Sequence, residues 1–207
     1  MWVVKLGGSL ARRGTLAGWL AVLAETGRGR AVIVPGGGPY VDAVREEQQR
    51  WGFDDSTAHS MALLAMDQYG HQLAAIGNRT VSRAFEATST YTEVRSALGR
   101  GVVGVWIGSR IAESDPTLPR SWDLTSDSLA AWLARDLNAS GLALVKSVRV
   151  EENGISATAL AAREWVDPRF PEFLRGVRFE TRLFGDGQEA LLERALGGAT
   201  AGLRVVV

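Results

Sequence analysis

The sequence predicts an α/β protein with a mainly parallel central sheet. Patterns typical of helices and strands alternate throughout its 207 residues, as they do in that fold class. The first fifty residues contain the same unit twice, an apolar strand followed by a glycine-rich turn and a helix. Because strands joined in this way run parallel, their glycine turns should lie at one edge of the sheet, where they could hold the two ends of a polyphosphate.

The first unit begins at the N-terminus. Trp2 to Leu6 is a short strand that is apolar except for Lys5, and a glycine pair at 7–8 follows it. Glycine lets the backbone approach a ligand closely, and Ser9 is a candidate cap for a helix through the apolar residues after Thr15. Exposed N–H groups beside a helix N-terminus and a lysine bind phosphate oxygens, so we expect a phosphate site here.

The second unit begins with an apolar strand over Arg30–Pro35. Three glycines follow at 36–38, and Pro39 opens a helix over Tyr40–Trp51, since proline is tolerated at a first helical position. The chain lacks the Walker A pattern of P-loop enzymes and the glycine fingerprint of dinucleotide-binding folds. A lysine two residues before the first glycines brings its positive charge from the strand instead.

Hydrophobic periodicity predicts the remaining elements. The helix after the second unit has candidate caps over Asp54–Ser56. A loop with two prolines is expected over Glu113–Arg120 and an irregular region over Asn153–Phe173. The sequence shows no repeat, low-complexity tract or linker, which predicts a single domain over residues 1–207. The predicted helices are Thr57–Ile76, Ser126–Ala139 and Gln188–Leu196, and the predicted strands are Val102–Ile107, Ala143–Val150 and Leu203–Val207.

Composition excludes several classes of partner and site. Acidic and basic residues balance at 23 each, which gives no electrostatic basis for binding nucleic acid or a membrane surface. With no cysteine and two histidines, disulfides, thiolate metal sites, a cysteine nucleophile and a multi-histidine zinc centre are not expected. The sequence has neither a secretory signal pattern nor an apolar run near the roughly 20 residues of a membrane helix. We therefore expect a soluble, cytoplasmic protein.

A third motif, Trp122–Ser128, joins a proline-containing loop to a helix. Thr125, Ser126, Asp127 and Ser128 therefore stand at a helix N-terminus. One interpretation is simple capping, in which Ser126 or Asp127 accepts hydrogen bonds from free N–H groups. The other is functional, because two aspartates and three hydroxyls exceed what one cap requires. A carboxylate there could orient lysine ammonium groups or help hold a phosphate-bound magnesium ion.

Four motifs, taken in order along nearly the whole chain, resemble the amino acid kinase family. They are Lys5–Ser9, Pro35–Gly38, Thr125–Ser128 and Leu144–Ser147. The family includes acetylglutamate, aspartate, glutamate, uridylate, carbamate and isopentenyl phosphate kinases. The resemblance implies a three-layer αβα sandwich around a mainly parallel sheet. It also implies transfer of the ATP γ-phosphoryl group to a carboxylate, carbamate or phosphate without a covalent enzyme intermediate.

The resemblance assigns roles residue by residue, with ATP and Mg²⁺ as the implied cofactors. Lys5 would bridge the phosphoryl groups and neutralise developing charge, and Asp127 would organise the catalytic lysines. Lys146 would lie close to the nucleotide, although a solvated lysine at a strand end is an equally good interpretation. No residue is assigned to the metal itself. The turn residues match the binding site for ATP phosphates, Gly7, Gly8 and Ser9, and the site that faces the acceptor, Gly36, Gly37 and Gly38.

The chain departs from the family pattern in two places. Many members carry a second essential lysine late in the chain, where this sequence has only arginines, of which Arg163 or Arg169 could substitute. The Asp-Gly motif that members carry on the adenine side is replaced by Glu152, Asn153 and Gly154. The sequence therefore leaves the nucleotide contacts of that region open.

The helix after the second glycine turn should determine the acceptor. His59 stands where uridylate kinases carry an acidic residue that contacts the acceptor, and a histidine would suit an anionic group, as in isopentenyl phosphate kinases. A partly buried capping histidine is the alternative interpretation. Asp67 and His71 are four residues apart and are expected to pair with each other on the helix surface.

Within the family, the short chain and the motifs around His59 and Asp127 most resemble the aminomethylfuran phosphate kinases of methanofuran biosynthesis. That resemblance implies phosphorylation of a small anion, (5-(aminomethyl)furan-3-yl)methyl phosphate, to its diphosphate. Two alternatives stay open: a kinase for UMP, isopentenyl phosphate or a carboxylate, and a non-catalytic protein that binds nucleotides or oxyanions. Seven tryptophans leave apolar surface to bury, so we expect a homo-oligomer.

Overall fold

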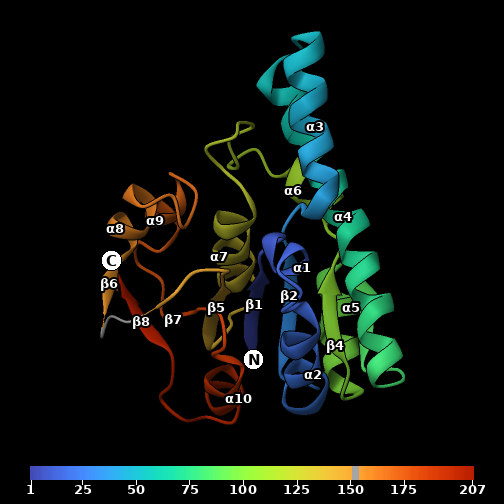
Figure 1. The fold of residues 1–207 in the computed structure, drawn as a ribbon, viewed down its shortest axis with the longest axis vertical. Helices are drawn as coiled ribbons and strands as arrows, with labels where there is room; N and C mark the ends of the chain where they lie inside the picture. The colour runs from blue at the N-terminus through green and yellow to red at the C-terminus, as the bar shows by residue number, and fades with distance from the viewer. Residues whose placement is uncertain (151–153) are drawn as a thin grey trace.

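Among the residues that the computed structural model describes, 1–150 and 154–207, eight strands form one mixed sheet (Figure 1). Their order across the sheet is β3-β4-β2-β1-β5-β7-β8-β6, and neighbours pair in parallel except β7 with β8. The strands are β1 (Trp2–Leu6), β2 (Ala31–Pro35), β3 (Phe85–Thr88), β4 (Val103–Trp106), β5 (Gly141–Val145), β6 (Ile155–Ser156), β7 (Glu180–Phe184) and β8 (Leu203–Val206).

Helices lie on both faces of the sheet, and Figure 1 shows α3 extending beyond one end of it. The longest, α4, begins at Asp55, slightly before the predicted start at Thr57. Asp54, one of the predicted candidate caps, accepts a hydrogen bond from Thr57 N at 2.7 Å and caps the helix. The helices in the described residues are α1 (Ser9–Arg12), α2 (Leu16–Thr26), α3 (Gly38–Trp51), α4 (Asp55–Thr80), α5 (Tyr91–Gly99), α6 (Ser109–Ser114), α7 (Ser126–Asp136), α8 (Ala157–Ala162), α9 (Phe170–Phe173) and α10 (Glu189–Leu196).

Alternate residues of β1 face two separate apolar layers. Trp2, Val4 and Leu6 belong to a buried cluster with residues of α2, α4 and α10, whereas Val3 belongs to another with α7, α8 and α9. Successive side chains of a strand point to opposite faces, so Lys5 shares the face of Val3, which α7 covers. A layer of helices on each face of the sheet makes the predicted three-layer αβα sandwich.

Three neighbouring strands end level with one another at the carboxyl edge of the sheet. Leu6 of β1 is in register with Pro35 of β2 on one side and with Val145 of β5 on the other. The strand order reverses at β1, and ligands of open α/β sheets bind outside the carboxyl ends of the strands at such a point. Both glycine turns follow these strand ends, so they lie at one edge of the sheet, as the sequence predicts.

One predicted strand is displaced in the structure. The strand predicted over Ala143–Val150 is β5, which begins at Gly141 and ends at Val145. It ends there because its neighbours β1 and β7 also end, at residues paired with Val145, and leave no partner for a longer strand. The residues that follow, including Lys146, are therefore free to lie over the edge of the sheet.

The region expected to be irregular, Asn153–Phe173, contains β6, α8 and α9. Asn153 itself lies outside the described residues. The two residues of β6 pair with β8, far along the chain, and Ser156 caps α8. β3, α5 and β7 are likewise missing from the sequence prediction, and α6 extends into the loop expected over Glu113–Arg120. Such short elements have little periodicity of their own and form because neighbouring elements pack against them.

Candidate functional site

The two glycine turns are in direct backbone contact. Gly36 N donates a hydrogen bond to Leu6 O at 2.9 Å, which joins the second turn to the end of β1. A Cβ atom on Gly8 would lie 2.8 Å from the N and Cα atoms of Gly38, and one on Gly36 would lie 2.9 Å from Gly8 N. These distances leave no room for a side chain, so the turns can meet only because both consist of glycine.

Gly7 and Gly37 extend this contact to either side. Gly7 N donates a hydrogen bond to Val145 O, at the end of β5, at 3.2 Å. A Cβ atom on Gly7 would lie 3.8 Å from Lys5 Nζ. Gly37 stands directly before α3 and lines a pocket on that side. Of the two joined turns, the first therefore lies beside Lys5 at Gly7, and the second lies beside the pocket at Gly37.

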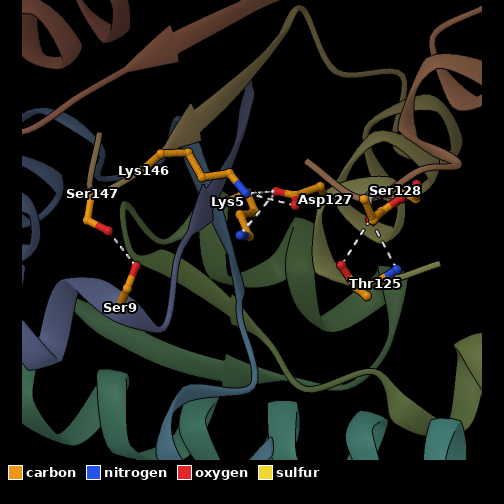
Figure 2. A network of polar contacts seen from close by, with 8 residues as sticks. Lys5, Ser9, Thr125, Asp127, Ser128, Lys146 and Ser147 are labelled. Carbon is orange, nitrogen blue, oxygen red and sulfur yellow. Dashed lines mark hydrogen bonds and ion pairs between the residues drawn. The ribbon is translucent and has the colours of Figure 1, made fainter. Parts of the chain in front are cut away.

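A buried carboxylate contacts two lysine ammonium groups (Figure 2). Asp127 Oδ1 is 3.0 Å from Lys5 Nζ and 2.7 Å from Lys146 Nζ, and Lys146 Nζ also donates a hydrogen bond to Asp127 Oδ2 at 2.8 Å. The side chains of Lys5 and Asp127 are each 6% exposed, and that of Lys146 is 14% exposed. β1, α7 and the residue after β5 thus bring three charges together at the carboxyl edge of the sheet.

Burial and charge act in opposite directions on these groups. Burial raises the pKa of Asp127, but the positive charges of Lys146 and Lys5 outweigh burial and hold that pKa below its usual value. Burial lowers the pKa of Lys146 to about 8, with a further lowering by Lys5, although the Asp127 carboxylate opposes both. A second anion next to Lys146 would favour its charged form, so the cluster is suited to receive phosphate oxygens.

Lys5 and Lys146 are the two lysines of the whole chain, whose other basic side chains, apart from histidine, are arginines. Since both lie in one site, the interpretation of Lys146 as a solvated strand-end lysine is wrong. The near absence of lysine from a chain with 23 basic residues is a sequence signal that could have singled Lys146 out. The surface ion pairs of this chain use arginine, whereas both lysines lie in the buried cluster. A lysine ammonium is a compact charge whose pKa shifts readily on burial.

The arginines considered as substitutes for a second lysine make other contacts. Arg169 pairs with Glu172 at 3.0 Å in an exposed position. The Arg163 guanidinium lies over the ring of Trp165, 5.3 Å from its centroid. Lys146 is therefore the second cation, besides Lys5, that contacts the Asp127 carboxylate.

A residue from a distant part of the chain caps the N-terminus of α7. Asp167 Oδ2 accepts hydrogen bonds at 3.0 Å from Thr125 N, Thr125 Oγ1 and Ser128 N, and Asp167 Oδ1 accepts one from Ser128 Oγ. The interpretation of Ser126 or Asp127 as the cap is therefore wrong. The sequence gives no signal for Asp167, because it stands between α8 and α9 in the region expected to be irregular.

Ser9 joins the first glycine turn to the end of β5. It is the first residue of the short helix α1 and not the cap of a longer one, since the helix after Thr15 is separate. Its Oγ atom lies 2.7 Å from Ser147 Oγ (Figure 2). Arg13, just after α1, forms an ion pair with Asp186 at 3.0 Å. These contacts hold α1 against the turns that follow β5 and β7.

Beyond these turns, the predicted adenine-side motif cannot be compared with the structure. Glu152 and Asn153 lie outside the described residues, which resume at Gly154. The neighbouring turn is defined by Gln188, whose side chain accepts a hydrogen bond from Gly185 N at 2.9 Å and donates one to Val150 O at 3.3 Å.

His59 lies in a pocket beside the second glycine turn. Its side chain is buried, and burial lowers its pKa, against the effect of a hydrogen bond with the Ser121 backbone. His59 belongs to the second turn of α4, whose cap is Asp54, so the interpretation as a capping histidine is wrong. The residues that line this pocket are Gly37, Val41, Arg45, His59, Ala62, Leu63, Met66, Trp122, Leu124, Thr125, Ser126 and Leu129.

Trp122 forms one wall of the pocket and is held by two side chains of α3. The Arg45 guanidinium carbon lies 4.6 Å from the centroid of the Trp122 ring, and Trp122 Nε1 donates a hydrogen bond to Gln48 Oε1 at 2.7 Å. The pocket combines apolar walls with an arginine, a histidine and two hydroxyl groups. Pockets of this kind suit a small ligand with an apolar body and an anionic end.

The predicted pairing of Asp67 with His71 is wrong. Asp67 instead accepts hydrogen bonds from the backbone N, at 3.2 Å, and from the hydroxyl of Ser109, the first residue of α6. Burial raises the pKa of Asp67, and the charge of His71 has a smaller, opposite effect. This contact fastens α4 to α6 at the wall of a second pocket, which Asp67 and Ser109 line together.

The described residues contain no group of three or more histidine, aspartate or glutamate side chains that could hold a metal ion. Asp127, the buried carboxylate of the site, already contacts two ammonium groups. The described side chains therefore do not fit a protein-held magnesium site. Among the helices described, none is long and apolar enough to span a membrane.

The sequence model of the amino acid kinase family matches residues 1–150 of this chain. One relative, the (5-(aminomethyl)furan-3-yl)methyl phosphate kinase of Methanocaldococcus jannaschii, is 29% identical over 139 residues. The alignment covers 67% of this chain and 62% of the relative. The chain therefore matches less than two thirds of the relative's length.

Solved structures share the fold over almost the whole chain. A UMP kinase from Bacillus anthracis has a TM-score of 0.75 at 13% identity, with 99% of this chain and 94% of that chain covered. A uridylate kinase from Archaeoglobus fulgidus has a TM-score of 0.72 at 14% identity, with 99% of each chain covered. At such low identities the likeness shows the αβα fold, and the site is argued from its own residues.

Gly8→Ala tests whether the contact between the glycine turns forms the phosphate site. The added Cβ would push apart backbone atoms only 2.8 Å away, so we expect the free energy of unfolding to fall by about 1–3 kcal/mol. ATP affinity, measured by calorimetry, should fall by roughly tenfold or more. Gly99→Ala is the control, because nothing lies within 4 Å of that Cβ. Unchanged ATP affinity in Gly8→Ala would contradict the assignment.

Lys146 should lose its proton near pH 8, because burial lowers its pKa to about that value. Its charge is present below this pH and lost above it, so ATP affinity should decline from about pH 7 to about pH 9. Lysine-selective ¹³C NMR follows the titration directly, since the chain has two lysines. Lys146→Arg should remove the decline, because a guanidinium keeps its charge. A signal that titrates near the ordinary value of 10.5 would contradict the prediction.

Proposed function

Because this chain belongs to the amino acid kinase family, we propose that it phosphorylates (5-(aminomethyl)furan-3-yl)methyl phosphate with ATP. The products are ADP and the furan diphosphate, an activated leaving group for later coupling. The observation that carries the kinase chemistry is the buried cluster of Lys5, Asp127 and Lys146 next to two joined glycine turns. The acceptor is inferred from the relative at 29% identity and from the pocket around His59.

The reaction is a direct transfer of the γ-phosphoryl group. An oxygen of the acceptor phosphate attacks the γ-phosphorus, the bond from that phosphorus to the bridging oxygen breaks, and ADP leaves with the electron pair. The acceptor phosphate is already an anion, so the step needs no protein nucleophile and no general base. Catalysis of this kind depends on positioning and on stabilising charge on the transferred group.

Different elements of the site position the substrates and stabilise the charge on the transferred group. Lys5 and Lys146 neutralise charge on the phosphate oxygens, and Asp127 holds both ammonium groups in place. The backbone N–H group of Gly8 binds the ATP phosphates, while the N–H group of Gly7 holds this turn to the end of β5 through Val145 O. The turn at 36–38 faces the acceptor phosphate. Ser9, which already contacts Ser147, fixes the first turn against the end of β5.

Magnesium enters this proposal as part of the nucleotide. The described residues offer no cluster of carboxylates for it, and Mg²⁺ commonly binds through substrate phosphates while keeping several of its waters. When bound, the ion neutralises charge on the ATP phosphates. Asp127 remains with the lysines.

The pocket accounts for the rest of the acceptor. The furan ring packs between the apolar side chains of Leu63, Met66 and Trp122, which line the pocket. His59, whose pKa is lowered by burial, acts as a neutral hydrogen-bond donor to the acceptor phosphate. Arg45 adds a positive charge at the outer wall.

A second acceptor class is favoured by one property of the same pocket. Its described lining contains Arg45 and His59 but no acidic side chain that would bind the ammonium group of an aminomethylfuran. An apolar monophosphate such as isopentenyl phosphate would also suit this lining. Glu113 is the glutamate whose charge acts on His59. Its side chain accepts a hydrogen bond from Ser60 Oγ at 2.6 Å.

An acceptor panel separates these possibilities. Purified protein with ATP and Mg²⁺ should form a diphosphate from the furan monophosphate, seen by phosphorus NMR, in preference to UMP, isopentenyl phosphate or a carboxylate. Lys5→Ala and Asp127→Asn should each lower kcat by about a thousandfold while the fold survives. Preference for another acceptor would identify a different kinase. ATP binding without turnover of any acceptor would support a non-catalytic binding protein.

Trp122→Ala should raise the acceptor KM with little effect on ATP affinity, because Trp122 is a wall of the pocket on the acceptor side. Loss of that apolar contact should raise KM by roughly tenfold. Trp51→Ala is the matched control, since Trp51 stands at the end of the same helix that holds Trp122 and is 67% exposed. Equal KM values for the two variants would exclude this pocket as the acceptor site.

A further inference from the structure

Asp167 is a buried carboxylate that none of the proposed catalytic steps uses. It is 6% exposed and stands between α8 and α9, beyond the part of the chain that matches the family model. Two N–H groups and two hydroxyl groups donate hydrogen bonds to it, and all four belong to Thr125 and Ser128. These residues flank Asp127 at the start of α7, so Asp167 holds the backbone on both sides of the site carboxylate.

The first turn of α7 contains serine, threonine and aspartate side chains that could accept hydrogen bonds from its free N–H groups. None of them caps the helix in this way. Serine, threonine and aspartate at a helix start normally accept hydrogen bonds from its free N–H groups. Here the Thr125 and Ser128 hydroxyls donate to Asp167 instead, and the Asp127 carboxylate contacts Lys5 and Lys146. A carboxylate from outside the motif thus performs the capping that Asp127 would otherwise perform.

We infer that Asp167 is a positioning residue for the phosphoryl-transfer centre: by capping α7 itself, it keeps the Asp127 carboxylate turned toward the two lysines. It touches neither lysine in the described contacts, and it acts through the backbone of Thr125 and Ser128. The inference rests on the proposed function of this site.

The electrostatics of the cluster agree with this division of roles. Burial raises the pKa of Asp167, and the nearby Asp127 charge raises it further, while the hydrogen bonds from Ser128 and Thr125 oppose both. The charged groups that face Lys146 are Asp127 of α7 and Lys5 of β1. If Asp127 turned away to cap the helix, Lys146 would keep the unfavourable effects of burial and of Lys5 but lose the charge that opposes them.

Asp167→Ala and Asp167→Asn test the inference. The alanine variant removes the cap, and the asparagine variant keeps its shape but turns an amide NH₂ group toward hydrogen-bond donors. Asp127 should then become the local cap, so kcat should fall by about a hundredfold in Asp167→Ala. The alkaline limb of kcat/KM should move to lower pH by roughly one unit, because Lys146 loses its counter-charge. KM for ATP should change less than kcat.

Thr90→Ala is the matched control, because Thr90 caps α5 by accepting a hydrogen bond from Glu93 N at 3.1 Å, outside the centre. It should lower thermal stability and leave the pH profile unchanged. Lysine-selective ¹³C NMR gives a second readout that needs no acceptor: both lysine signals should shift in the Asp167 variants and neither should shift in Thr90→Ala. Loss of stability with unchanged lysine signals would overturn the inference and leave Asp167 with a structural role alone.

A milder variant covers the case in which Asp167 substitutions prevent folding. Ser128→Ala removes one donor and keeps the Asp167 charge, so the Lys146 signal should titrate at a lower pH, by less than in Asp167→Asn. An unchanged signal overturns the inference. Failure of the unaltered protein to phosphorylate the furan acceptor, with lysine signals that still respond to Asp167, would reject the proposed substrate and keep the positioning role.

Discussion

The buried carboxylate between two ammonium groups is the interaction on which the rest of the site depends. Placing charges out of water is unfavourable unless partners and hydrogen bonds compensate, and here two cations share one carboxylate. The cluster therefore carries an excess positive charge while both lysines are protonated. Burial, with a smaller contribution from the Lys5 charge, lowers the pKa of Lys146 to about 8. In the proposed reaction, a phosphate anion would place negative charge beside the two ammonium groups and favour their charged forms.

The sheet gives this cluster a rigid base. β1, β2 and β5 end in register, so Lys5, the two glycine turns and Lys146 all emerge at one height on the carboxyl edge. The absence of side chains at Gly8, Gly36 and Gly38 lets the turns touch through backbone atoms alone. The proposed sites for the ATP phosphates and for the acceptor phosphate therefore lie next to each other.

The pocket around His59, which we propose as the acceptor site, and the cluster of Lys5, Asp127 and Lys146 are joined through the start of α7. Thr125 and Ser126 line the pocket, the next residue is Asp127, and Asp167 holds the backbone on both sides. The C-terminal third, which contributes β7 and β8 to the sheet, therefore also acts on the site. This arrangement lets a segment beyond the recognisable family sequence influence the geometry of a centre built by the first 150 residues.

The sequence by itself determined the α/β class and the two strand–glycine–helix units, because strand patterns and glycine positions are local properties of the chain. The order of the motifs singled out Lys5 and Asp127 as candidate site residues, and the structure brings them into contact. The sequence left Lys146 undecided between a solvated and a functional position. Its two-lysine composition pointed to the answer, but only pairing with Asp127 at 2.7 Å decided it.

Tertiary structure alone decided which group caps α7, where β5 ends and which elements occupy the region after Gly154. β5 ends where its neighbours end, and β6 exists because β8 pairs with it. Asp167 reaches α7 from 39 residues along the chain, through contacts that no local pattern encodes. A hydrogen-bond donor at a helix start is satisfied by whichever acceptor the fold brings close, and a sequence read in order cannot specify that acceptor.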